Sequence, residues 1–328
     1  MIKNSELSFV VQGSVGDPKI VNKCLNSIRL HFPGSIIILS TWVSSNLDEI
    51  FEYDELVLSD DPGFFWLNKE KNISNNLNRQ IVSTRNGLDV VQTKYSVKVR
   101  ADSFFFNDTL LSVYSSYVDH DDRILTITST SRNPRRRYKM AYHICDFVYM
   151  SQTVNLRGMF SCALMSESDA YWFDDHEIPS HAPSSSILHR LSAEQYLWIS
   201  FLRFKNQKVL INSAYEFDTN ILKHSEKMIS DYAIITKAQK VGIYNQKHKN
   251  IDLHGYDNYT DNEFIMLHKN KGMLPDSIFV RSLDFDLILL GVINITYPTI
   301  KFIFGFTFPL CVSALNKARD FKIRMMRS

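Results

Sequence analysis

The stretch YSVKVRADSFFF, residues 95–106, decides how the fold is interpreted. It begins as an apolar, β-branched strand and ends in two cations and a carboxylate, Lys98, Arg100 and Asp102. Because alternate residues of a strand share a face, these three side chains could line up on one side of a sheet. Alternatively, they form the solvent-facing stripe of an ordinary edge strand. The sequence thus raises the question of whether this strand delivers charge to a ligand.

Strand patterns and helix patterns alternate on the N-terminal side of this stretch. Apolar strands are predicted over residues 8–15, 35–40 and 55–63. Apolar residues at helical spacing predict helices from Ile20 to Phe32 and from Ile73 to Val91. Strands that alternate with helices indicate an α/β fold with an open, mostly parallel sheet.

The predicted strands all end in polar residues. These are Gln12 and Gly13, Ser40 and Thr41, Asp60 and Asp61, and residues 100–103. In open α/β sheets, ligands bind beyond the carboxyl ends of the strands. The sequence therefore predicts a polar site at this edge, where the cations suit phosphate and the carboxylates suit a divalent cation.

Further strands are predicted at 123–130 and 146–151, and a helix over residues 190–204. Ser192 and Gln195 predict a capping box at the start of this helix. Glu194 then lies in the first turn, where the helix dipole favours the ionised carboxylate, so it is a candidate general base. Alternatively, it only stabilises the helix. His176, His181 and His189 flank the preceding polar loop, and such histidines are usually solvated.

Two other polar stretches allow two interpretations each. Asn78, Arg79 and Gln80 lie in the stretch NNLNRQ, residues 75–80, near the start of a predicted helix. They could bind phosphate or sugar hydroxyls there, or the asparagines of this stretch only cap the helix. Arg135, Arg136 and Arg137 are typical of a solvated loop, and could also steer an anionic acceptor or meet anionic lipid.

The composition excludes several classes of protein. A net charge of +2 over 328 residues gives no strong field for nucleic acid. The four cysteines are widely spaced, without CxxC or a Cys/His cluster, which argues against a disulfide framework or a structural zinc site. GxGxxG, GxxxxGK[ST], GxSxG and HExxH are absent. With no signal-peptide pattern at the N-terminus, a cytoplasmic chain is expected.

The C-terminal part differs from the rest. Residues 287–312 are strongly apolar but are interrupted by Asn294, Pro298, Lys301 and Pro309, and a basic segment follows. A membrane span needs about 20 mostly apolar residues, so helices lying in the membrane interface are favoured over a span. The alternative is a core helix followed by a solvated basic segment. We expect a domain over residues 1–220 and an extension over 221–328 for acceptor and membrane contacts.

The motifs together resemble the WavE-type lipopolysaccharide synthesis family. The resemblance runs from about Ser8 to Phe204 and rests on a set of stretches in order, namely FVVQG, SIRLHFPGSIIILSTW, LSDDPG, NNLNRQIVSTRNGL, KYSVKVRADSFF, CDFVYM and AEQYLW. It implies a GT-A-like, Rossmann-type glycosyltransferase with a C-terminal helical extension. It also implies a nucleotide-sugar donor and a lipopolysaccharide or capsule glycan as acceptor.

The resemblance also implies roles for individual residues. Those expected around the nucleotide-sugar are Gln12, Gly13, Thr41, Asp60, Asp61, Asn78, Arg79 and Gln80. Asp102 would take the place of the acidic motif that holds Mg²⁺ or Mn²⁺ in GT-A enzymes. The sequence Arg-Ala-Asp has one carboxylate where the paired motif has two, so Lys98 and Arg100 could instead neutralise the diphosphate.

The expected reaction is direct displacement with Glu194 as the base, which inverts the anomeric centre, at the inner face of the cytoplasmic membrane. Two other functions stay open. One is a different nucleotide-dependent transferase on a similar sheet, such as a nucleotidyl- or glycerophosphotransferase. The other is a non-catalytic protein of carbohydrate binding or glycan assembly.

Overall fold

The structure is a computed structural model that describes residues 2–68, 72–117, 120–182, 189–245, 257–272 and 274. The chain divides into two compact units, Met1–Pro275 and Asp276–Ser328. Every described residue belongs to the first unit. The predicted C-terminal helical extension, including the apolar stretch 287–312, lies outside the described residues.

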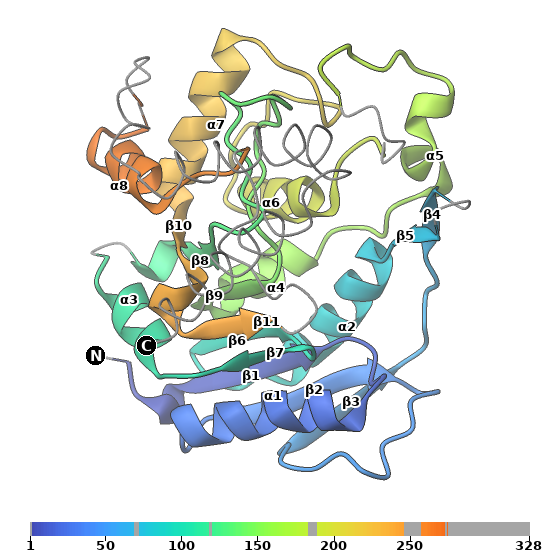
Figure 1. Ribbon diagram of the computed structural model, residues 1–328, viewed down its shortest axis with the longest axis vertical. Coiled ribbons are helices and arrows are strands. Elements are labelled where there is room, and N and C mark those ends of the chain that lie inside the picture. The colour runs from blue at the N-terminus through green and yellow to red at the C-terminus, as the bar shows by residue number, and fades with distance from the viewer. Residues whose placement is uncertain are drawn as a thin grey trace, which may run out of the picture. The chain divides into compact units, whose positions relative to one another are not determined.

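A seven-stranded sheet forms the centre of the first unit (Figure 1). Its strands are β1 (Leu7–Gln12), β2 (Ile36–Trp42), β3 (Glu55–Ser59), β6 (Tyr95–Arg100), β8 (Ile124–Ile127), β9 (Val148–Gln152) and β10 (Ala233–Thr236). Their order across the sheet is β10-β8-β9-β6-β1-β2-β3. Two small antiparallel sheets pair β4 (Phe65–Asn68) with β5 (Ile73–Asn75), and β7 (Ser103–Phe105) with β11 (Ile243–Asn245).

The sheet is mostly parallel, as predicted. Strands β1, β2, β3 and β6 run in one direction, and β10 runs parallel to β8. Strand β9 runs antiparallel to both of its neighbours, β6 and β8. Gln12 is level with Ser40 on one side and with Arg100 on the other, so the polar strand ends meet at one edge as expected.

Helices cover both faces of the sheet. One face packs against α1 (Pro18–His31), α3 (Thr109–Ser115) and the β7–β11 pair, through side chains such as Phe9 and Val97. The other face, which includes Val10 and Tyr149, packs against α2 (Leu77–Val90), α4 (Thr153–Phe160), α6 (Ala193–Phe204), α7 (Thr219–Tyr232) and α8 (Asp261–Lys269). Short helices are α5 (Glu167–Ala170), η1 (Asn4–Glu6), η2 (His120–Asp122), η3 (Trp172–Asp174) and η4 (Ala238–Val241).

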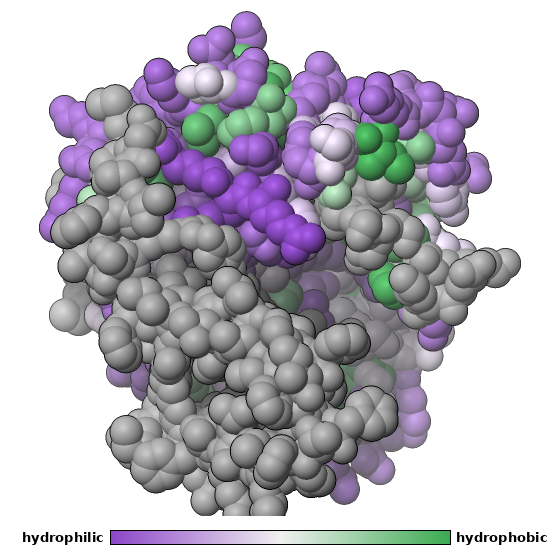
Figure 2. Space-filling model, turned by 45° about the horizontal axis from the view of Figure 1, so that its top comes forward, coloured by the Kyte–Doolittle hydropathy of each residue, from purple (hydrophilic) through white to green (hydrophobic). Residues whose placement is uncertain are grey.

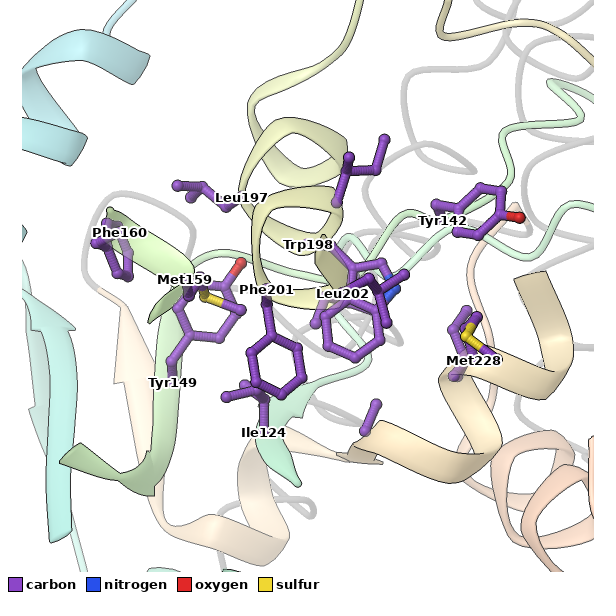
Figure 3. Close-up of a cluster of buried hydrophobic side chains, with 14 of the residues drawn as sticks. Ile124, Tyr142, Tyr149, Met159, Phe160, Leu197, Trp198, Phe201, Leu202 and Met228 are labelled. Carbon is purple, nitrogen blue, oxygen red and sulfur yellow. The ribbon is translucent and has the colours of Figure 1, made fainter. Parts of the chain in front are cut away.

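Helix α6 is anchored in the core on the second face. Figure 3 shows Leu197, Trp198, Phe201 and Leu202 of α6 surrounded by side chains from the sheet and from other helices. All four are fully buried. Burying a side chain of this size stabilises a fold by roughly 1.5–3 kcal/mol, so this helix is held firmly in place. Its first turn carries Glu194.

The sequence predicted six of the seven strands of the central sheet and helices α1, α2 and α6, with three differences. The second predicted helix begins at Leu77, because Ile73 belongs to β5. The predicted strand of residues 95–106 is two strands, β6 and β7, separated by Ala101 and Asp102. The sheet also continues past residue 220, because β10 pairs with β8. Residues of the predicted extension thus belong to the central sheet, while its roles in acceptor and membrane contacts stay predictions.

Gly87 of α2 packs directly against strands β1 and β2. A Cβ atom placed on Gly87 would lie 2.5 Å from Cγ1 of Val10 and 3.1 Å from Cβ of Ser40. We expect Gly87→Ala to lower the free energy of unfolding by about 1–2 kcal/mol, because overpacking outweighs the better helix propensity of alanine. Urea denaturation measures the change. Gly16→Ala is the control, since a Cβ at Gly16 meets nothing within 4 Å, and an equal effect in both variants contradicts the packing explanation.

Candidate functional site

A pocket of about 750 Å³ lies at the carboxyl ends of β1 and β6 and beside the start of α6. Eight of the site residues predicted from the sequence line this pocket: Gln12, Gly13, Asp61, Arg79, Gln80, Arg100, Asp102 and Glu194. They come from β1, the segments after β3 and β6, and the first turns of α2 and α6. The tertiary structure therefore brings together residues from five separate parts of the chain.

Four other predicted residues do not line it: Thr41, Asp60, Asn78 and Lys98. Thr41 is buried and shares a hydrogen bond with Ser45. Asn78 is buried, donating to the carbonyl of Met165 and accepting from its N–H. Asn78 thus joins α2 to the segment after α4.

Two arginine–aspartate pairs lie in the pocket wall. Arg79 donates from Nε and Nη2 to the two carboxylate oxygens of Asp61, at 2.8 and 2.6 Å. Arg100 donates in the same way to Asp102, at 2.9 and 2.7 Å. About a third of each side chain is exposed, between 27% and 33%. Such two-pronged pairs fix both guanidinium groups at the pocket surface.

The carboxylate of Asp102 does not fit the predicted role of metal ligand in this arrangement. Arg100 occupies both of its oxygens, and Nδ2 of Asn245 donates to Oδ1 at 2.8 Å. Burial raises the pKa of Asp102, but the hydrogen bonds and charge of Arg100 outweigh it, so the pKa is lowered from its usual value. Asp102 is therefore the ionised partner of a cation.

Lys98 lies beneath the pocket. Its side chain is fully buried, its Nζ lies 5.5 Å from the ring centre of Tyr149, and it donates to the main-chain carbonyl of Asp146. Burial lowers the pKa of Lys98 to about 8, while the charge of Asp146 opposes the shift. Gln80 also donates to the Asp146 carbonyl, at 3.4 Å. Lys98 therefore positions Asp146, which lines the pocket.

Helix α6 places Glu194 at the other side of the pocket. The predicted capping box is confirmed, because Ser192 and Gln195 exchange hydrogen bonds of 3.1 and 3.2 Å. Nε2 of Gln195 also donates to the carbonyls of Ala141 and Ala214, which fixes the helix start.

The helix start favours the ionised form of Glu194, as expected, but it does not dominate the pKa of this side chain. Burial, followed by repulsion from Asp146, raises the pKa of Glu194 to about 7, and the backbone N–H of the helix start only partly offsets these effects. Oε2 of Glu194 lies 3.6 Å from Nε2 of His143, which is buried and has a pKa well below its usual value because of that burial. A carboxylate that titrates near neutral pH beside a neutral imidazole can both accept and release a proton.

Sequence reasoning missed several residues of the pocket wall, including Trp42, Asp146, His189 and Tyr215. His189 is buried, although loop histidines are usually solvated. Its Nδ1 lies 2.5 Å from the carbonyl of Ala170, so this nitrogen carries the proton and Nε2 is left as an acceptor. Asp146 lies in the motif CDFVYM, and a polar residue directly before an apolar strand was the signal that could have identified it as a site residue.

A family model for WavE lipopolysaccharide synthesis matches residues 7–283. The chain belongs to the WavE lipopolysaccharide synthesis family. The match includes every element of the pocket wall and extends well past Phe204, the last residue of the motifs that carry the resemblance. No curated protein matches the chain.

Three solved structures share a distant similarity with this WavE-family chain. The crystal structure of S. aureus TarS has a TM-score of 0.34 and 13% identity, and the match covers 82% of this chain and 43% of TarS. The 1–349 form of TarS has a TM-score of 0.33 and 14% identity, with 73% and 68% covered. The same form in complex with UDP-GlcNAc has a TM-score of 0.32 and 14% identity, with 73% and 69% covered.

Two further findings concern metals and membranes. Among the described residues, no group of three or more His, Cys, Asp and Glu side chains could hold a metal ion. Within the same part of the chain, no helix is both long enough and apolar enough to cross a membrane.

The raised pKa of Glu194 makes stability depend on pH. Between its ordinary value of 4.5 and about 7, the folded chain keeps a proton that the unfolded chain has lost, so this contribution to stability falls as pH rises. Glu194→Gln removes the titration. We expect the unfolding free energy of this variant, relative to wild type, to rise by roughly 2 kcal/mol between about pH 5 and pH 8. Urea titrations of both proteins test this, and an unchanged difference contradicts the raised pKa.

Proposed function

We propose that the chain is a glycosyltransferase that moves a sugar from a nucleotide-sugar donor to a hydroxyl of a lipopolysaccharide or capsule glycan. Membership of a lipopolysaccharide synthesis family supports this proposal. The observation that carries it is the position of Glu194, whose pKa is about 7, in a pocket at the carboxyl ends of parallel strands.

The donor lies along the strand ends in this proposal. Trp42 and Tyr215 supply aromatic surface in the pocket wall, and Gln12 and Gly13 supply polar groups at the end of β1. The guanidinium groups of Arg79 and Arg100 suit the diphosphate, since each side chain is partly exposed and fixed by its aspartate.

The sequence left two alternatives open, Mg²⁺ or Mn²⁺ on Asp102 or neutralisation of the diphosphate by cations, and the proposed function follows the second. Because both oxygens of Asp102 are engaged by Arg100, the proposed step runs through protein side chains alone. Asp102 then holds Arg100 in position for the donor.

The proposed step forms one bond and breaks one bond. The acceptor hydroxyl oxygen attacks the anomeric carbon, and the bond from that carbon to the diphosphate oxygen breaks. The electron pair leaves with the nucleoside diphosphate, whose charge Arg79 and Arg100 stabilise. The hydroxyl proton passes to the Glu194 carboxylate, and direct displacement inverts the anomeric centre.

Membrane contact belongs to the same proposal. The apolar residues 287–312 and the basic segment after them would hold the enzyme at the inner face of the cytoplasmic membrane.

Donor binding is the first test. A nucleotide-sugar that binds the folded chain must raise its melting temperature, so a panel of nucleotide-sugars identifies the donor by thermal shift. We expect Arg79→Gln to abolish most of the shift, and we expect Mn²⁺ and a chelator to leave it nearly unchanged. Lys23→Gln is the control, because Lys23 lies over Phe104 outside the pocket wall. A shift that requires Mn²⁺ would overturn the metal-free binding of the diphosphate.

The second test concerns Glu194. We expect Glu194→Gln to lower the rate of sugar transfer about 10²–10⁴-fold, because a general base is lost, while the donor thermal shift is retained. The assay separates glycosylated products by mass, which also distinguishes a nucleotidyl- or glycerophosphotransferase. If Glu194→Ala and Asp102→Ala both fully restore surface glycan in a deletion strain, the chain is a non-catalytic assembly protein.

A further inference from the structure

The basic loop of residues 131–142 is divided into two kinds of cation. Arg135 pairs with Glu226 of α7, whose side chain is 1% exposed, and Arg136 pairs with Glu263 of α8, whose side chain is 6% exposed. Glu263 also forms the capping box of α8 with Thr260. These two arginines therefore fasten the loop to the helices instead of being solvated.

The other three cations of the loop rest on aromatic rings. Cζ of Arg132 lies 5.6 Å and Cζ of Arg137 lies 5.3 Å from the ring centre of Tyr138, and Nζ of Lys139 lies 4.6 Å from that of Phe217. Within the described part of the chain, none of the three cations forms an ion pair with a carboxylate. We name Arg132, Arg137 and Lys139 the loop cations.

The loop cations lie beside the Glu194 side of the pocket. Tyr138 packs against Ala214 and Tyr215, which both line the pocket. Burial dominates the raised pKa values of Glu194 and Tyr215, and in both cases the charge of Arg132 opposes it. The charge of Arg132 therefore acts on Glu194 and Tyr215, two residues of the pocket wall.

We propose that the loop cations form a subsite for an oxyanion, a phosphate or a carboxylate, on the glycan acceptor. This inference rests on the proposed function and specifies that the glycan acceptor carries a negative charge near the transfer site. The loop cations are held by rings and lack carboxylate partners in the described residues, so binding an oxyanion there displaces no internal ion pair. The donor diphosphate has its own cations in Arg79 and Arg100.

An oxyanion on a glycan fits these observations better than a lipid surface. The two rings under the cations, Tyr138 and Phe217, are partly buried. None of the exposed large hydrophobic side chains of the described chain lies within residues 131–142. On the face drawn in Figure 2, hydrophilic side chains cover most of the described surface and apolar ones form small separate groups. An interfacial segment would present apolar side chains next to its cations.

The test is binding of glucose 6-phosphate and of glucose to the full chain by isothermal titration calorimetry. We expect wild type to prefer the phosphorylated sugar, and we expect Arg132→Gln/Arg137→Gln to weaken its binding at least about tenfold. Lys23→Gln/Arg203→Gln removes the same number of charges elsewhere and should bind as wild type does. Arg79→Gln should also bind as wild type does, which separates this subsite from the donor cations.

Four results would overturn the subsite. Three of them are equal binding by wild type and the double variant, equal binding of glucose and glucose 6-phosphate, and loss of binding in the Arg79→Gln variant alone. A fourth is a double variant that loses sedimentation with vesicles of phosphatidylcholine and phosphatidylglycerol but keeps sugar phosphate binding, which would identify a lipid surface. If the double variant does not fold, Lys139→Gln replaces it, with a several-fold loss expected.

Failure of the subsite and failure of the proposed function give different results. In the first case, wild type shows a donor thermal shift and transfers sugar, but the double variant binds glucose 6-phosphate normally. This result supports the glycosyltransferase and contradicts the subsite. In the second case, the double variant loses binding of glucose 6-phosphate, but wild type transfers no sugar. This result supports the anion subsite and contradicts the glycosyltransferase.

Discussion

A buried ammonium group connects the fold to the pocket. Lys98 has no exposed surface, sits in the central strand β6, and donates to the main-chain carbonyl of Asp146. Burying a cation is costly unless it is hydrogen-bonded, so this contact fixes the position of residue 146 relative to the sheet. The charge of Asp146 is, after burial, the second-largest cause that raises the pKa of Glu194. The chemistry available at α6 therefore depends on a contact beneath the pocket.

Ion pairs sort the arginines of this chain into different roles. Arg135 and Arg136 are neutralised by nearly buried glutamates of α7 and α8 and hold a loop in place. Arg79 and Arg100 are paired with partly exposed aspartates, so their guanidinium groups stay at the pocket surface. The same side chain is structural when its partner is buried and available to a ligand when the pair is exposed. The sequence does not show this difference, because the run Arg135-Arg136-Arg137 does not indicate which arginine has a buried partner.

Local patterns predicted the parts of the fold that depend on local physics. Alternation of strands and helices predicted the mostly parallel sheet, and Ser192 with Gln195 predicted the start of α6. The antiparallel direction of β9 was not predicted, because apolar residues read the same in both directions. The sequence analysis also missed α7, β10 and α8, which lie in a part of the chain without a clear strand or helix period. Of the site, strand ends and helix starts identified eight residues of the pocket wall, while His189 was missed because burial of a loop residue is set by distant packing.

The sequence by itself determined which strands carry polar ends and which helix begins with a capped glutamate, because strand period and capping are local properties. It also determined the family, since the ordered motifs are a property of the chain alone. Only the tertiary structure decided that Lys98 lies beneath the pocket and that the guanidinium group of Arg100 pairs with the carboxylate of Asp102. It also decided that Glu194 titrates near neutral pH. The physical reason is that burial and the distance to other charges fix pKa values and ion pairs, and both arise only when remote segments pack together.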